Sequence, residues 1–258
     1  TPVYSKLKDM ISSGELGEIR RTNWIVTTWY RPQSYFDSGG WRATWKGEGG
    51  GVLLNQCPHQ LDMWQWICGM PNRVRAFCQF GKYHNIEVED DVTAYVEYPN
   101  GGTGVFITST ADTPGTNRFE ITGNLGKIVA EKDSLKFWKL KTPERQFNSE
   151  YHGGYGEPEC EMIDVPYEPI TPHGHEKILN NWISSILHGD ELLAPGEEGI
   201  NGLSISNAMH LSSWLDEWVD IPVDEDLYVK KLEEKIAQST FEKTTGAEKT
   251  MEVKHTFG

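Results

Sequence analysis

The stretch Val92-Thr93-Ala94-Tyr95-Val96-Glu97-Tyr98-Pro99-Asn100-Gly101-Gly102-Thr103-Gly104-Val105-Phe106-Ile107-Thr108-Ser109-Thr110 decides the fold class of this chain. Its two halves are rich in β-branched and aromatic residues, which favour strands. The four residues between them, 99–102, are typical of a tight turn, because proline fixes φ and glycine tolerates positive φ. The stretch therefore predicts a β-hairpin, in which two antiparallel strands lie side by side.

Further strand patterns lie on both sides of this hairpin. Residues 18–30 contain the run Trp24-Ile25-Val26-Thr27-Thr28-Trp29-Tyr30, and the turn Gly123-Asn124-Leu125-Gly126 separates two later strands. The other expected strands are 73–83, 118–122, 127–131 and 135–140. Consecutive short strands that are joined by hairpin turns predict an open, mostly antiparallel sheet.

Helical periodicity flanks the strands. Apolar residues recur every three or four positions in the expected helices, which are 2–13, 52–68, 175–188, 199–218 and 224–238. Residues 31–48 and 142–172 show no such period, and we expect them to be loops. We therefore predict an α+β fold with helices packed on one face of the sheet. One domain covers residues 1–240, and a polar tail covers 241–258.

Composition limits the classes of function. The chain has 258 residues, 37% of them hydrophobic, and a net charge of −14, which disfavours binding to nucleic acid or to an anionic membrane surface. Neither a signal peptide nor an apolar run long enough to span a bilayer is found in the sequence. The four cysteines lack the spacing of a metal site and indicate a reducing compartment, so we expect a cytoplasmic protein. The chain begins with Thr-Pro, which indicates a truncated or processed piece of something longer.

A glycine-rich turn leads into the second expected helix, Gly49-Gly50-Gly51-Val52-Leu53-Leu54-Asn55-Gln56-Cys57-Pro58-His59-Gln60-Leu61-Asp62. Asn55 and His59 stand four residues apart, so on one continuous helix they share a face. A histidine in that place is equipped to move protons for a bound substrate. Pro58 conflicts with a continuous helix, and we expect either a kink or a late helix start there.

Several segments resemble the Gfo/Idh/MocA family of oxidoreductases. These are the run Ser13–Ile19, the glycine-led segment with Asn55-x-x-x-His59-x-x-Asp62, the run Glu89–Ala94 and the run Pro195–Gly199. The resemblance implies that the chain is the C-terminal domain, whose open sheet supplies the substrate pocket and usually the oligomer interface. It also implies that His59 is the acid/base on a sugar hydroxyl. Asn55 then positions the substrate, since an amide cannot take a proton.

The cofactor half of that family is not found in this sequence. No G-x-G-x-x-G motif follows an expected strand, and the family's Glu-Lys-Pro motif is missing. The resemblance implies NAD or NADP for the full-length enzyme. We expect neither to bind this chain alone, and we expect no hydride transfer by the isolated chain.

Four further residues are candidates for contact with a sugar or polyol. Tyr30 and Arg31 close the first expected strand, and Arg42 and Trp45 lie just before the glycines. A guanidinium donates paired hydrogen bonds to hydroxyl groups, and aromatic rings pack on the C–H faces of sugars. Packing within the loop is the alternative for each of them. Asp62 either orients the imidazole of His59 or serves only as a structural helix residue.

Two functions therefore stay open. The favoured one is the substrate-binding and catalytic-histidine domain of an NAD(P)-dependent sugar or polyol oxidoreductase, which forms homo-oligomers through its sheet. The alternative is a cofactor-free carbohydrate-binding or scaffold module that dimerises in the same way. For the acidic run Glu87–Asp91 near His84 we expect a solvated strand edge rather than a metal site.

Overall fold

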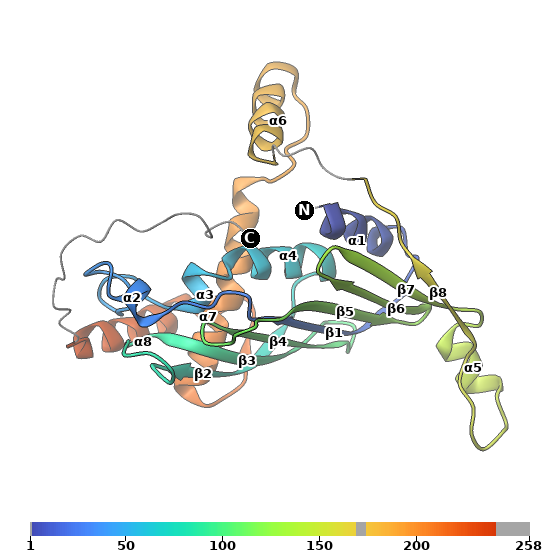
Figure 1. The fold of residues 1–258 in the computed structure, drawn as a ribbon, viewed down its shortest axis with the longest axis horizontal. Coiled ribbons are helices and arrows are strands. Elements are labelled where there is room, and N and C mark those ends of the chain that lie inside the picture. The colour runs from blue at the N-terminus through green and yellow to red at the C-terminus, as the bar shows by residue number, and fades with distance from the viewer. Residues whose placement is uncertain (1, 169–173, 241–258) are drawn as a thin grey trace.

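The computed structural model of this chain describes residues 2–168 and 174–240, and the expected polar tail at 241–258 lies outside them. Within the described residues one nine-stranded open sheet runs through the molecule in the order β8-β7-β6-β5-β1-β4-β3-β2-β9 (Figure 1). The strands are β1 (Ile19–Val26), β2 (Arg73–Phe80), β3 (Glu89–Glu97), β4 (Thr103–Ser109), β5 (Asn117–Gly123), β6 (Gly126–Glu131), β7 (Ser134–Leu140), β8 (Cys160–Asp164) and β9 (Val219–Asp220). The α+β prediction is confirmed.

The predicted hairpin is β3 and β4. Val96 pairs with Gly104 and Tyr95 with Val105 in an antiparallel register. The turn closes by hydrogen bonds from Tyr98 N to Gly102 O (2.8 Å) and from Gly101 N to Tyr98 O (2.9 Å). Gly101 has φ +80°, a conformation that favours glycine. β1 lies between β4 and β5 and runs parallel to β4, while the other neighbouring strands are antiparallel.

The helices are α1 (Pro2–Ser12), α2 (Gln33–Phe36), α3 (Val52–Asn55), α4 (Pro58–Cys68), α5 (Glu144–Glu150), α6 (Gly174–His188), α7 (Gly199–Leu215) and α8 (Glu225–Gln238). Among them α1, α3 and α4 lie over one face of the sheet, above it in Figure 1, whereas α6 stands away from the sheet and α5 lies below one end of it. The covered face carries aromatic residues that interlock with α4: Trp64 stacks on Phe106 with 5.3 Å between ring centroids, and its indole N–H donates to Thr22 Oγ1 (3.1 Å). This packing fixes α4 on the centre of the sheet.

Pro58 divides the predicted helix 52–68 into two. α3 ends at Asn55, and α4 begins at Pro58, which occupies the first turn where a missing N–H costs nothing. The expected late helix start is confirmed. The prediction that Asn55 and His59 share one face of a helix is wrong, because the two residues belong to different helices.

Two segments that we expected to be loops contain regular structure. Residues 31–48 include the short helix α2, and residues 142–172 include α5 and β8. β8 extends the sheet by pairing with β7, and Glu144 of α5 forms an ion pair with Arg20 of β1. The sequence of this region lacks a clear period because its side chains stay exposed on most sides. Among the described helices none is both long and apolar enough for a membrane span.

Candidate functional site

A buried carboxylate holds the glycine turn in place. Glu89, at the start of β3, accepts hydrogen bonds from Gly51 N (2.9 Å) and Leu53 N (3.0 Å) through Oε1. Its Oε2 lies 3.0 Å from Nε2 of His210 on α7, and both side chains are fully buried. Burial alone raises the pKa of Glu89, but the charge and contact of His210 and the amide of Leu53 outweigh it, so the pKa lies below its ordinary value.

The expectation of a solvated acidic edge is therefore wrong for Glu89, and also for its neighbour Asp90, which is completely buried. Asp90 accepts from the backbone amides of Lys82, Tyr83 and His84. The ring of His84 then bridges Asp90 Oδ2 (3.0 Å) and the carbonyl oxygen of Arg31 (2.9 Å). Carboxylates that accept several hydrogen bonds from backbone amides in this way hold the chain in place, so their role is structural. Within the described residues, no group of three or more His, Cys, Asp or Glu could hold a metal ion.

A polar network surrounds Asn55 at the end of α3. Its Oδ1 accepts from the Tyr35 hydroxyl (3.1 Å) and from Gln56 Nε2 (2.8 Å), and its Nδ2 donates to Glu48. The same tyrosine oxygen accepts from Arg42 (2.7 Å), whose guanidinium also stacks over the Tyr35 ring at 4.4 Å. The structure thus brings Asn55 and Arg42 together, as links that hold the 33–48 segment against α3.

His59 stands apart from this network, on the first turn of α4. Its side chain is exposed and makes no hydrogen bond or ion pair with any other described residue. It lines a pocket of about 300 Å³ between α4 and α7. The other lining residues are Leu53, Leu54, Pro58, Asp62, Gly199, Gly202, Leu203 and Ser206. A free imidazole at the mouth of a half-apolar pocket can both accept and donate a proton.

The remaining candidates are distributed around these two places. Asp62 lines the His59 pocket, but its carboxylate accepts from Gln65 (3.0 Å), and no hydrogen bond in the described part of the chain joins it to His59. Tyr30 is exposed, and Arg31 lies over the Tyr35 ring at 5.2 Å. Trp45 is only 6% exposed and packs on the rings of His210 and Trp214, so the structure places it in the core.

Several residues that build the site were not among the candidates. Tyr35 and Glu48 lie in the segment 33–48, close in sequence to the candidate Arg42. In the structure Tyr35 joins Arg42 to Asn55. Glu89 lies in a family motif and in the acidic run, and its role depends on the contact between the start of β3 and the glycine turn. His210 sits on a helix whose apolar period gave no hint of a buried ion pair.

The glycine turn before α3 is a poor fit for the phosphates of a dinucleotide. The turn Gly49–Gly51 leads into α3, but the amides of Gly51 and Leu53 already donate to the Glu89 carboxylate, which repels a phosphate. A Cβ at Gly51 would also stand 2.1 Å from the Glu89 carbonyl oxygen, so this glycine serves close packing. The turn therefore supports α3 and offers no phosphate cradle.

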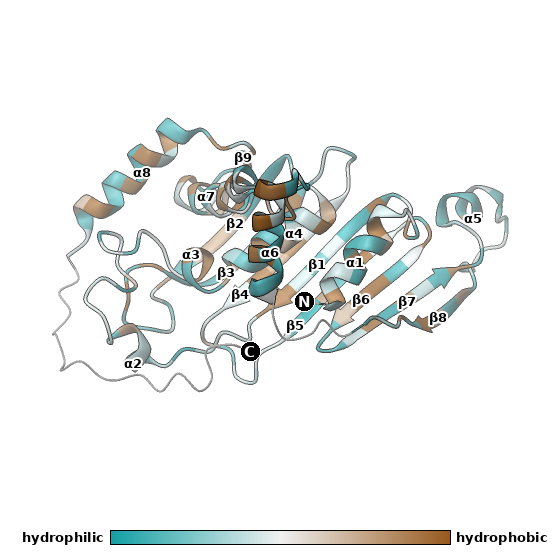
Figure 2. Cartoon of the chain, turned by 90° about the horizontal axis from the view of Figure 1, so that it is seen from above, coloured by the Kyte–Doolittle hydropathy of each residue, from teal (hydrophilic) through white to brown (hydrophobic). Residues whose placement is uncertain are grey.

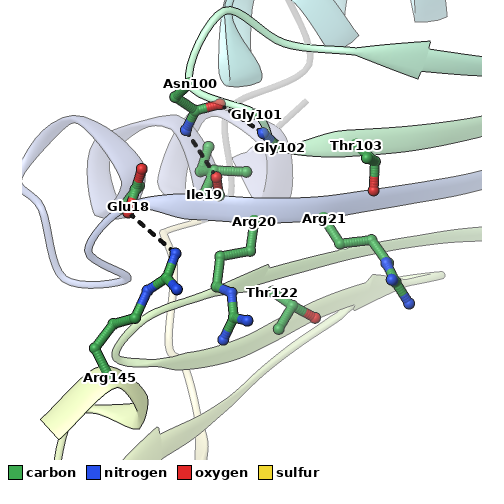
Figure 3. A pocket seen from close by; sticks show the side chains of 10 residues that line it. All are labelled: Glu18, Ile19, Arg20, Arg21, Asn100, Gly101, Gly102, Thr103, Thr122 and Arg145. Atoms are coloured by element: carbon green, nitrogen blue, oxygen red, sulfur yellow. Dashed lines mark hydrogen bonds and ion pairs between the residues drawn. The ribbon is translucent and has the colours of Figure 1, made fainter. Parts of the chain in front are cut away.

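A second, larger pocket of about 470 Å³ lies at the other end of β1 (Figure 3). Arg20, Arg21 and Arg145 line it together with the β3–β4 turn. Arg20 is paired with Glu144, and Arg145 lies 4.0 Å from Glu18, so two of the three guanidinium groups already face a carboxylate. None of its lining residues belongs to the His59 pocket or to the candidates. We place the site at the smaller pocket because it holds the free imidazole.

Known proteins resemble this chain in sequence and in fold. Residues 4–129 match the family model described as GFO/IDH/MocA C-terminal domain. No curated protein matches the sequence. The WlbA dehydrogenase from Chromobacterium violaceum, solved with NADH and UDP-GlcNAcA, is 26% identical with a TM-score of 0.67, over 86% of this chain and 61% of that chain.

Two further structures share the fold at lower identity. The WlbA dehydrogenase from Bordetella pertussis is 22% identical (TM-score 0.68; 87% of this chain, 62% of that chain), and levoglucosan dehydrogenase in complex with NADH is 19% identical (TM-score 0.67; 86% and 63%). This chain thus spans about three fifths of the length of these proteins. The resemblance to the Gfo/Idh/MocA family is confirmed for residues 4–129, which match the model of its C-terminal domain.

Proposed function

We propose that this chain is the substrate-binding and proton-transferring part of an NAD(P)-dependent sugar or polyol oxidoreductase. The observation that carries the proposal is the unpartnered imidazole of His59 at the mouth of the pocket between α4 and α7. The family and the sugar ligands of two related dehydrogenases, UDP-GlcNAcA and levoglucosan, support a sugar as the substrate.

The described residues of this chain serve the proton and the substrate, while a dinucleotide held by another unit exchanges the hydride in such enzymes. Neutral His59 takes the proton of the substrate hydroxyl when its carbon is oxidised, and the protonated ring returns it in the reverse direction. Leu203 and Leu54 give the pocket apolar walls for the C–H faces of a sugar, and Asp62 offers an acceptor for a second hydroxyl. Asn55 and Arg42 act indirectly, by holding the segment beside α3.

Ligand binding to the isolated chain tests this function without a cofactor. We expect UDP-GlcNAcA, levoglucosan or a related sugar to shift the imidazole NMR resonance of His59 and to leave that of His175, an exposed histidine on α6, unchanged. A Leu203→Arg substitution fills the pocket and removes the shift. If no sugar moves the His59 resonance at millimolar concentration, the proposed function is wrong.

We also propose that the uncovered face of the sheet joins two copies of the chain. Exposed apolar side chains lie on this face, among them Phe77 on β2 and Tyr95 on β3. Exposed aromatic side chains on an open sheet face are typical of a subunit interface. Sedimentation velocity of the Phe77→Asp, Tyr95→Asp double variant tests this: we expect a monomer, and an unchanged sedimentation coefficient would contradict the proposal.

A further inference from the structure

A cluster of arginines lines the larger pocket, at the end of β1. The chain carries 38 acidic residues against 24 lysines and arginines, so three guanidinium groups around one cavity are a local exception. Arg20 and Arg21 come from β1, and Arg145 comes from α5. The cavity of about 470 Å³ has the size of a small-molecule site. This concentration of positive charge favours an anionic ligand.

A β-bulge brings two of these arginines to the same pocket. In the pairing of β1 with β5, Ile19 lies opposite Gly123. Arg21, two positions later, lies opposite Thr122, so Arg20 is an extra residue in β1. A bulge of this kind breaks the alternation of side chains and re-aims one of them. Figure 3 shows that the side chains of Arg20 and Arg21 leave β1 on the same side, whereas a regular strand would send neighbours to opposite faces.

Arg21 stands between two hydroxyl groups. It lies opposite Thr103 of β4 as well as Thr122 of β5, so the three residues form a row on one face across three neighbouring strands. All three line the pocket (Figure 3). In the part of the chain that the structure describes, the Arg21 side chain makes no hydrogen bond, ion pair or ring contact. A free guanidinium with a hydroxyl on each side is a suitable set of donors for the oxygens of a phosphate group.

Hydrogen bonds hold the walls of this pocket in place. The β3–β4 turn is tied to β1, because Asn100 Nδ2 donates to the carbonyl oxygen of Ile19 (2.9 Å). Asn100 Oδ1 accepts from Gly102 N within the turn (3.0 Å). On the other side, the backbone amide of Arg145 donates to Asn124 Oδ1 (2.9 Å), which fixes the start of α5 against the β5–β6 turn. Walls that are already ordered lower the entropic cost of binding a ligand.

Two carboxylates share the pocket with the arginines. Glu144 pairs with Arg20, and Glu18 lies 4.0 Å from Arg145. These four side chains are between 31% and 61% exposed, and ion pairs between exposed side chains contribute little. Three positive and two negative charges still leave an excess of one positive charge, which belongs to the free Arg21. A doubly charged anion can therefore enter beside Arg21 and compete with Glu18 for Arg145.

We propose that this pocket binds a phosphate group, either as the free dianion or as the monoester of a small molecule. The guanidinium of Arg21 donates paired hydrogen bonds to two phosphate oxygens, and the hydroxyls of Thr103 and Thr122 donate to oxygens beside them. Arg145 balances the second negative charge. The site shares no lining residue with the His59 pocket, so this inference goes beyond the proposed function and does not depend on it.

Isothermal titration calorimetry of the full 258-residue chain with glycerol 3-phosphate tests the site. We expect binding of this ester and none of glycerol at the same millimolar concentration. Arg21→Gln weakens the binding by a factor of about 10 or more, the usual effect of losing hydrogen bonds between charged groups. Arg118→Gln is the matched control, because it also removes one positive charge from β5's side of the sheet, but Arg118 pairs with Glu131 outside the pocket. Equal affinities of wild type and Arg21→Gln, or an equal loss in Arg118→Gln, overturn the proposal.

Removing the competing carboxylate gives a test in the opposite direction. Glu18→Gln frees Arg145, so we expect glycerol 3-phosphate to bind more tightly by a factor of about two to five. The exposed positions of Arg21 and Glu18 leave the melting temperature of both variants as in the wild type. Tighter binding of glycerol 3-phosphate than of inorganic phosphate identifies an ester as the ligand, and equal affinity identifies the free ion. Weaker binding in Glu18→Gln, or no binding of either phosphate at millimolar concentration, overturns the site.

Discussion

The clamp between Glu89 and the glycine turn predicts a large loss of stability in Glu89→Gln. Two backbone amides, those of Gly51 and Leu53, donate to this carboxylate, and His210 lies 3.0 Å from its other oxygen. A hydrogen bond to a charged group contributes about 1 kcal/mol more than a neutral one, so the two amides account for about 2 kcal/mol. Removing one partner of a buried ion pair costs about 3–5 kcal/mol.

These contributions overlap because the same carboxylate makes all three contacts, so we expect a loss of about 3 kcal/mol in Glu89→Gln. For a domain of this size that loss lowers the melting temperature by about 6–12 °C. Urea denaturation followed by tryptophan fluorescence measures it, since Trp45 and Trp214 pack directly on His210. Glu233→Gln, at an exposed position of α8, is the matched control and stays within about 0.5 kcal/mol of the wild type.

The lowered pKa of Glu89 adds a pH signature. Its stabilisation is complete above the ordinary carboxyl pKa of about 4.3, and is lost as the pH falls through the lower folded-state pKa. The contribution of the Glu89 charge to the stability difference between wild type and Glu89→Gln is therefore complete at about pH 5 and shrinks below about pH 4. A difference below 1 kcal/mol at pH 7, or one that grows toward acid pH, would refute the clamp.

Three further predictions concern the same region. Gly51→Ala lowers the free energy of unfolding by more than about 2 kcal/mol, because its Cβ would stand 2.1 Å from a carbonyl oxygen of β3. The control Gly49→Ala, in open space at φ +80°, costs about 1 kcal/mol. Equal losses of the two variants in urea titrations would contradict this prediction. Tyr35→Phe removes the hydroxyl that links Asn55 and Arg42, and it lowers the free energy of unfolding by about 1–2 kcal/mol in the same assay. An unchanged free energy of unfolding would show that the network is not structural. In the native protein, the exposed Cys160 reacts with a thiol reagent at pH 8, while Cys57 does not, because burial raises the pKa of the Cys57 thiol. Mass spectrometry locates the modified residue. Rapid labelling of Cys57 would contradict its burial.

The strands and most helices follow from the sequence because their signals are local. The turn residues 99–102 set the register of the β3–β4 hairpin. Asp224 caps α8 by accepting a hydrogen bond from the amide of Leu227 (3.0 Å), which agrees with the acidic residues at the start of this helix. Pro58 is likewise a local signal, and the late start of α4 could be read from it. The parallel pairing of β1 with β4 could not, since it joins strands that are far apart in the chain.

The site was harder to predict because it depends on contacts between distant segments. Glu89 looks like part of a solvated acidic run until β3 places it under the glycine turn, where buried amides replace water. Trp45 looks like a sugar-stacking residue until the aromatic rings of α7 enclose it. Asn55 and His59 are four residues apart in the sequence, but a helix break gives them different surroundings, one in a structural network and one at a pocket.

One measurement tests the central claim most directly: the rate of sugar-dependent NAD(P)+ reduction by the intact protein from its source cells, compared between wild type and His59→Asn. The panel of substrates includes UDP-GlcNAcA and levoglucosan, and His175→Asn is the control. We expect kcat to fall by a factor of about 10²–10⁴ in His59→Asn, the usual contribution of a general acid or base, with the control unchanged. Equal rates in wild type and His59→Asn, or no reduction with any sugar, would contradict the account.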